Sequence, residues 1–171
     1  YTVYDKSLVS DTPVTIYGLR LKVNPSNTTP GRTYHDFKVD IGYTQSPQVD
    51  LSLYYQPRSF FTGTPQRVYD AAYTAVFSVG ATADYDLYIP FSSPFTYNPA
   101  SGHLAIIYET TSAAPFNPTG AMFRVALAPV TSGKMDYVLG KFGCCWGGAT
   151  SSHVNTAPHI QLVTDASSRI L

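Results

Sequence analysis

The chain has 171 residues, the size of one domain, and its 11 basic and 11 acidic side chains cancel to no net charge. A chain without a positive field lacks the electrostatic basis for binding nucleic acid, and no apolar run reaches the ~20 residues of a membrane span. Charged residues make up only 13% and aromatic residues 14%. This composition is more typical of a rigid extracellular or cell-surface β-protein than of a cytosolic enzyme.

The first twelve residues combine a strand-forming run with residues that interrupt it. Residues 1–4 have strand propensity, and Asp5, Lys6 and Asp11 then break the pattern. A segment of this kind adds either to its own sheet or to the open edge of a neighbouring subunit. Residues 1–12 are therefore a candidate strand-exchanging segment, with Tyr1, Val3 and Tyr4 as its assembly residues.

Period-two alternation predicts the next three strands, at residues 14–23, 37–43 and 51–55, with a Pro- and Gly-containing loop at 24–32. In the first of them the alternation places side chains on two opposite faces: Thr15, Tyr17, Leu19, Leu21 and Val23 on one, and Ile16, Arg20 and Lys22 on the other.

The middle of the chain contains a long connection and a β-rich run. Residues 56–66 are rich in Pro, Gly and aromatic side chains, which predicts a crossing between two sheets. Residues 68–79 follow with strong strand propensity. The part at 71–79 carries no charge, so it is available for pairing with another chain if it lies at a sheet edge.

The clearest pattern in the chain is an antiparallel pair at residues 85–91 and 104–108, where large apolar residues alternate with others. Pro90 and Pro94 cannot donate to a ladder, so we expect them to bend or end the first strand and keep it near an edge. Gly102 supplies the turn into the second strand.

Further strands are expected at 122–128 and 136–142 and around Ile160 and Leu162, with a glycine-rich loop at 143–148. Helix signals are nearly absent. About eight to ten strands with long loops predict an all-β protein, a single antiparallel two-sheet β-sandwich of jelly-roll or Ig-like type that spans residues 1–171.

The motifs between Tyr34 and Glu109 resemble those of bacterial secreted β-sandwich domains, which occur in proteins sorted by PEP-CTERM-type signals and in planctomycete exported proteins. The matching parts are 39–44, 51–53, the Pro-Phe-Thr-Tyr-Asn-Pro block at 94–99, and 102–107. Asn98 stands where Asp is common, and His103 where Asn is common. The resemblance implies export and a structural or surface role, with no established chemistry.

No nucleophile elbow, phosphate-binding loop or dinucleotide fingerprint is present, so we expect no enzymatic activity and no cofactor. The spacing of the four histidines fits no metal pair, so we expect solvated loop histidines: His35, His103, His153 and His159. Asp84 and Asp86 share a face at a strand entry and could begin a calcium site, but two carboxylates are too few to complete one.

Cys144 and Cys145 are adjacent. They can form a strained vicinal disulfide, form separate bonds to partners outside the chain, or stay reduced in a glycine-rich loop. The other features point outside the cell, where thiols oxidise, so the oxidised pair is the favoured alternative.

Several aromatic residues lie in or near expected loops, where rings can stack on sugars or on partner proteins: Tyr54, Tyr55, Phe60, Phe61, Tyr97 and Trp146. The alternative is that such rings are half buried with their polar tips in water. Trp146, beside the cysteines, is the best candidate for a ligand or partner contact.

These features together predict an exported structural protein that assembles with itself into a filament, tube or surface layer, by strand addition between subunits. The alternative is an extracellular carbohydrate-binding or adhesive module whose partner is a polysaccharide. Folds do not determine function, so the choice depends on sites and surfaces.

Overall fold

The computed structural model describes residues 2–22, 31–46, 57–76 and 87–110, and in the last third of the chain residues 127–129, 135–138, 153–154, 156–158, 160–164 and 168–170. Within these ranges the helical elements are short: α1 (Lys6–Val9) and the 3₁₀ turns η2 (Pro57–Phe60) and η3 (Pro99–Ser101). None of the described helices is long and apolar enough to cross a membrane.

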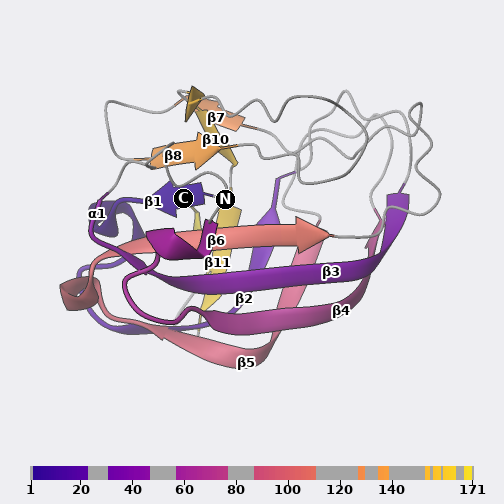
Figure 1. Cartoon of the computed structure of the whole chain (residues 1–171), viewed down its shortest axis with the longest axis horizontal. Coiled ribbons are helices and arrows are strands. Elements are labelled where there is room, and N and C mark those ends of the chain that lie inside the picture. Colours follow the sequence, from indigo (N-terminus) through magenta and orange to yellow (C-terminus); the bar gives the residue numbers. More distant parts are fainter. Residues whose placement is uncertain are drawn as a thin grey trace.

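Most of the described residues lie in strands (Figure 1). In chain order these are β1 (Thr2–Tyr4), β2 (Val14–Leu21), β3 (Gly31–Thr44), β4 (Gln66–Val76), β5 (Leu87–Tyr97), β6 (His103–Thr110), β7 (Leu127–Pro129), β8 (Met135–Val138), β9 (His153–Val154), β10 (Thr156–Pro158), β11 (Ile160–Thr164) and β12 (Ser168–Ile170).

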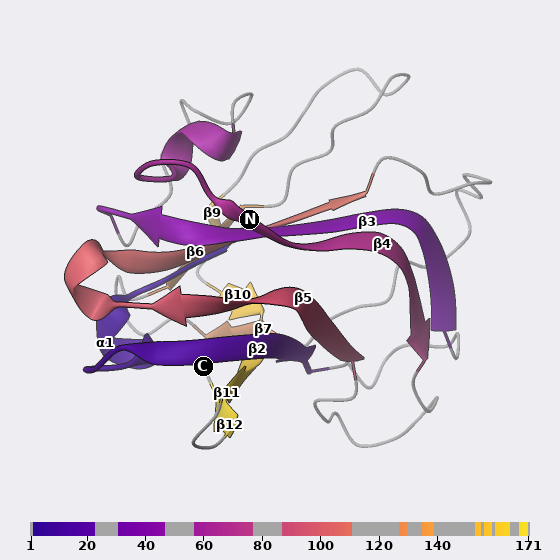
Figure 2. The same cartoon turned by 90° about the horizontal axis from the view of Figure 1, so that it is seen from below.

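The strands form two main antiparallel sheets, which confirms the predicted all-β sandwich-like fold. One has six strands in the order β4-β3-β6-β1-β8-β9, and the other has four in the order β12-β11-β2-β5; β7 and β10 form a separate pair. Figure 2 shows β2 and β5 in one layer and β3, β4 and β6 in the other. The long connections between paired strands make this a topology of non-local contacts.

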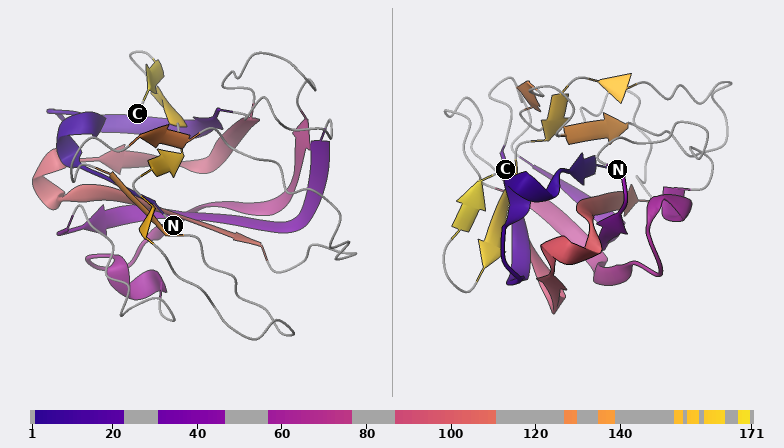
Figure 3. Two further views of the ribbon diagram at one scale, coloured as in Figure 1. Left: turned by 90° about the horizontal axis from the view of Figure 1, so that it is seen from above. Right: turned by 90° about the vertical axis from the view of Figure 1, so that its left-hand side faces the viewer.

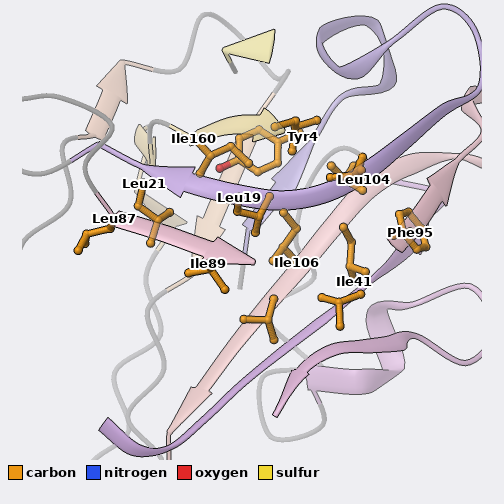
Figure 4. Close-up of a cluster of buried hydrophobic side chains, with 14 of the residues drawn as sticks. Tyr4, Leu19, Leu21, Ile41, Leu87, Ile89, Phe95, Leu104, Ile106 and Ile160 are labelled. Atoms are coloured by element: carbon orange, nitrogen blue, oxygen red, sulfur yellow. The ribbon is translucent and has the colours of Figure 1, made fainter. Parts of the chain in front are cut away.

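The core lies between the two sheets (Figure 4). Alternate residues of β3 and β6, such as Ile41 and Ile106, meet alternate residues of the four-stranded sheet, such as Leu19, Ile89 and Leu162, and all are fully buried. This is the arrangement that period-two alternation predicts for strands with one face covered.

In β2 the predicted facing is wrong at two positions. The pairing of β2 with β11 shifts where Val163 lies opposite Gly18 and Thr164 lies opposite Ile16, which is a β-bulge in β2. One extra residue turns Tyr17 to the surface and leaves Ile16 on the same buried face as Leu19. Strict alternation placed Tyr17 with Leu19 and put Ile16 opposite them.

Other differences concern where strands begin and end. β3 begins at Gly31, inside the predicted loop 24–32, and β5 continues through Pro90 and Pro94 to Tyr97. β5 lies at the edge of its sheet, as expected for a strand that contains prolines. The strand predicted at 51–55 lies outside the described residues.

Candidate functional site

β1 occupies an interior position in the six-stranded sheet. It pairs antiparallel with β6 on one side, Thr2 opposite Ile106 and Tyr4 opposite Leu104, and with β8 on the other. All three of its residues are buried. The predicted strand-forming segment therefore lies within its own sheet in this chain, one of the two alternatives considered above; Tyr1 itself lies outside the described residues.

The side chains of β1 fill both faces of the sheet. Tyr4 belongs to the main core (Figure 4). Val3 points to the other face, where it packs with Phe61, Ala105 and Ile107. Thr2 is fully buried, and its hydroxyl has no hydrogen-bond partner among the described residues. A buried hydroxyl without a partner costs about 1–3 kcal/mol, so the fit of β1 to this position is incomplete.

A short capped helix follows β1 and fixes its exit. The carboxylate of Asp5 accepts from the Ser7 N–H at 2.8 Å and caps α1, a role typical of Asp. His103, the first residue of β6, lies against this helix: its Nδ1 is 3.2 Å from Asp5 Oδ2 and accepts from the Lys6 N–H at 3.2 Å. His103 is thus a mostly buried strand residue, and the expectation of a solvated loop histidine was wrong for it.

The outer face of the six-stranded sheet is covered by the segment that begins with η2. Figures 2 and 3 show η2 on the side of this sheet opposite β2. The Thr62 N–H donates to the Tyr43 carbonyl oxygen at 2.7 Å and anchors the segment to the end of β3. Phe61 is buried against Val3, and Phe60 packs on the same cluster. Phe60 and Phe61 therefore have packing roles, which is the alternative to a ligand-contact role.

A charge cluster holds the same segment in place. Arg58 from η2 donates to Asp40 at 2.7 Å and to Glu109 at 3.1 Å, and Arg67 from β4 donates through two nitrogens to Asp40. Burial alone raises the pKa of Asp40, but the hydrogen bonds from Arg67 and Arg58 outweigh burial and hold that pKa below its ordinary value. Sequence reasoning missed this cluster; its one visible sign is Asp40 between the apolar Val39 and Ile41 on a strand.

The Pro-Phe-Thr-Tyr-Asn-Pro block forms a hydrogen-bonded corner between β5 and β6. Asn98 caps η3 by accepting from the Ala100 N–H at 3.0 Å. The Tyr43 hydroxyl accepts from the Asn98 N–H at 2.8 Å and donates to the Thr96 carbonyl at 2.9 Å. Tyr97 is fully buried and donates to the Gly102 carbonyl at 2.9 Å, so in this fold it packs in the core and supports the corner.

The predicted uncharged segment partly lies at a sheet edge. β4 is the edge strand of the six-stranded sheet, and its described part includes residues 71–76. Its outer side faces β5, and side chains link the two strands. Ser92 donates to the Val68 carbonyl at 2.9 Å, and Tyr73 to the Tyr88 carbonyl at 3.2 Å. This edge is therefore partly covered within the same chain.

Cys144, Cys145, Trp146, Asp84 and Asp86 lie outside the described residues. Among the residues with described positions, no three His, Cys, Asp or Glu side chains come together in a way that could hold a metal ion.

Comparison with known proteins found no matching family model, no matching curated protein and no matching solved structure. The resemblance to bacterial exported β-sandwich domains therefore stays a prediction.

Proposed function

We propose that the protein is an exported structural subunit that assembles with copies of itself into an extracellular filament, tube or layer, and that subunits are joined by exchange of β1. The observation that carries this proposal is the position of β1. It is a three-residue strand whose two edges are both paired and whose side chains fill both faces of the sheet.

A subunit that releases β1 exposes two backbone edges, on β6 and β8, and opens a hole in both apolar clusters. The β1 of another copy matches this position as well as the subunit's own, because its sequence is identical. The buried Thr2 hydroxyl, which lacks a partner among the described residues, lowers the free energy needed to release β1 from the sheet. Neutrality of the whole chain removes the repulsion that keeps copies apart.

A removal experiment tests the dependence on β1. We expect the parent protein to form polymers, seen by light scattering and negative-stain microscopy over a range of concentrations. A variant without residues 1–10 should form none. Added peptide of residues 1–12 should raise its melting temperature by filling the empty position. Polymers from the shortened variant, or a parent that stays monomeric at every concentration, would contradict the proposal.

A crosslinking experiment distinguishes exchange from other modes of assembly. Val3 lies directly opposite Ala105 in the ladder, so the double variant Val3→Cys with Ala105→Cys places two thiols at bonding distance. After assembly and oxidation, exchanged β1 strands should give a ladder of disulfide-linked multimers on a denaturing gel. The two single variants are the controls. If the polymers yield only a monomer band with an internal disulfide, β1 remains in the sheet of its own subunit.

A further inference from the structure

A strap, residues 57–65, lies against the outer face of the six-stranded sheet and leads into β4 (Figure 2). On that face the paired positions of three neighbouring strands form one row: Gly42 on β3 lies opposite Ala105 on β6, and Ala105 lies opposite Val3 on β1. Side chains at directly paired positions lie on the same face of a sheet. The row therefore rises from no side chain, through a methyl group, to the isopropyl group of β1.

The ring of Phe61 in the strap fills the low part of this row. A Cβ atom added to Gly42 would lie only 2.8 Å from Cδ1 and 3.1 Å from Cε1 of Phe61. Phe61 is buried and shares one apolar cluster with Val3, Ala105 and Ile107. The strap therefore packs on β1 through the contact between Phe61 and Val3, in space that a glycine at position 42 leaves open.

The polar anchors described for the strap lie on strands other than β1. The Thr62 N–H donates to the Tyr43 carbonyl oxygen at 2.7 Å. Arg58 donates to Asp40 at 2.7 Å and to Glu109 at 3.1 Å. Tyr43 and Asp40 belong to β3, and Glu109 belongs to β6. These bonds hold the strap against the sheet through β3 and β6, while its contact with β1 is apolar packing.

We propose that the strap is a latch that retains β1 in the sheet of its own subunit. β1 has three residues, and Val3 is the one that packs in the outer apolar cluster. Release of β1 therefore breaks the contact between Val3 and Phe61. When the strap lifts, Val3 loses its cover, and the free energy needed to release β1 falls. Control of assembly by the latch rests on the proposed exchange of β1, but the coupling of the strap to β1 is measurable in the monomer.

Hydrogen exchange followed by mass spectrometry, at concentrations too low for assembly, tests this coupling. Peptides that contain β1 give the readout, and peptides from β2, in the other sheet, are the reference. Phe61→Ala should speed exchange in β1 about tenfold or more without the same change in β2. Arg58→Gln changes a half-exposed side chain, should act in the same direction, and keeps the test open if Phe61→Ala does not fold. Lys38→Gln removes a cation that pairs with Asp36 on β3 and should leave β1 unchanged.

A reversible lock distinguishes the latch from a general loss of stability. Gly42→Cys with Phe61→Cys places a thiol of the strap beside a thiol of β3, because the Cβ position of residue 42 adjoins the side chain of residue 61. With the disulfide formed, β1 should exchange about tenfold or more slowly than in the reduced form of the same variant. Polymers should also grow more slowly from the oxidised form. The parent, treated with the same oxidant and reductant, controls for Cys144 and Cys145.

The outcomes separate the latch from the proposed function. Equal exchange of β1 in the oxidised and reduced forms would overturn the latch, as would a rise in Phe61→Ala that is as large in β2 as in β1. Polymers that grow equally fast from both forms would overturn it as a control of assembly. A parent that never polymerises contradicts the proposed function instead, and the exchange rates of β1 still decide whether the strap holds it.

Discussion

Asp40 shows how one buried carboxylate can organise a covering segment. Its side chain is 4% exposed, yet it stays ionised because Arg58 and Arg67 both donate to it. Arg58 comes from η2 and Arg67 from β4, so a single acid joins three elements. A buried ion pair stabilises little relative to an apolar substitute, but removal of one partner leaves the others uncompensated.

Asp40→Asn should therefore lower the free energy of unfolding at pH 7 by about 3 kcal/mol, since two arginines lose their acceptor. The pKa of Asp40 is lowered in the folded state, so its ionised form stabilises the fold above the ordinary pKa of 3.8. This contribution is lost as the pH falls below 3.8 and through the lower folded pKa. Urea titrations between pH 7 and pH 2.5 should show that acid-dependent loss in the parent.

The matched control is Asp36→Asn, because Asp36 pairs with Lys38 at 3.0 Å on a more exposed part of β3. Exposed pairs contribute about 0–1 kcal/mol, so this variant should keep nearly all of the parent's stability and its acid dependence. Equal losses in the two variants would contradict the role assigned to the buried cluster.

Thr2→Val tests the incomplete fit of β1. Valine has the shape of threonine and removes the buried hydroxyl that lacks a partner among the described residues. Chemical denaturation should show a gain of about 1 kcal/mol, the cost of an unsatisfied hydroxyl at the low end of its range. A better-held β1 should also slow assembly. Unchanged stability would mean that the Thr2 hydroxyl is satisfied after all. Thr33→Val is the control, because the exposed Thr33 hydroxyl lies 3.0 Å from the Thr74 hydroxyl and its removal should bring no gain in stability.

At the scale of elements, the corner between β5 and β6 depends on Tyr43. Its hydroxyl makes two hydrogen bonds to the corner's backbone, and its ring stacks on Tyr97 with centroids 5.7 Å apart. Tyr43→Phe keeps the stack and loses both bonds, so unfolding free energy should fall by about 1–3 kcal/mol. Tyr17→Phe changes an exposed side chain, so its change in the free energy of unfolding should be within the error of the same urea titration. Similar losses of unfolding free energy in the two variants would show that the Tyr43 hydroxyl does not stabilise the corner.

At the scale of the whole molecule, the sequence predicts what is local and misses what depends on pairing. Alternation identified β3, β5 and β6, because in each strand a run of every second residue packs into the main core. The bulge at Tyr17 arises from how β2 aligns with β11, and the Asp40 cluster joins residues up to 69 positions apart. Neither leaves a periodic signal. The position of β1 between β6 and β8 also depends on strands that are distant in the sequence, so the local pattern does not predict it.

The two sheets meet at β4 and β5, and this contact should be the most easily opened part of the described fold. The strands lie beside each other, but no backbone ladder joins them; Pro90 and Pro94 on β5 have no N–H to donate. Gln66 donates instead to the Ser93 and Pro94 carbonyls at 3.3 and 3.1 Å. Side-chain hydrogen bonds between edge strands break more readily than the backbone hydrogen bonds of a central ladder.

Hydrogen exchange followed by mass spectrometry should therefore rank the strands. Peptides from β6, which has ladders to β3 and β1 on both sides, should exchange slowest, and peptides from β5 should exchange faster. Gln66→Ala with Ser92→Ala removes side-chain links and should speed exchange in β4 and β5 while leaving β6 unchanged. β1 pairs with β6, so its release leaves one edge of β6 unpaired. If β1 moves between subunits, the amide hydrogens of β6 should therefore exchange with solvent faster before assembly than after it. Equal protection of β5 and β6 would mean that the two sheets open as one unit.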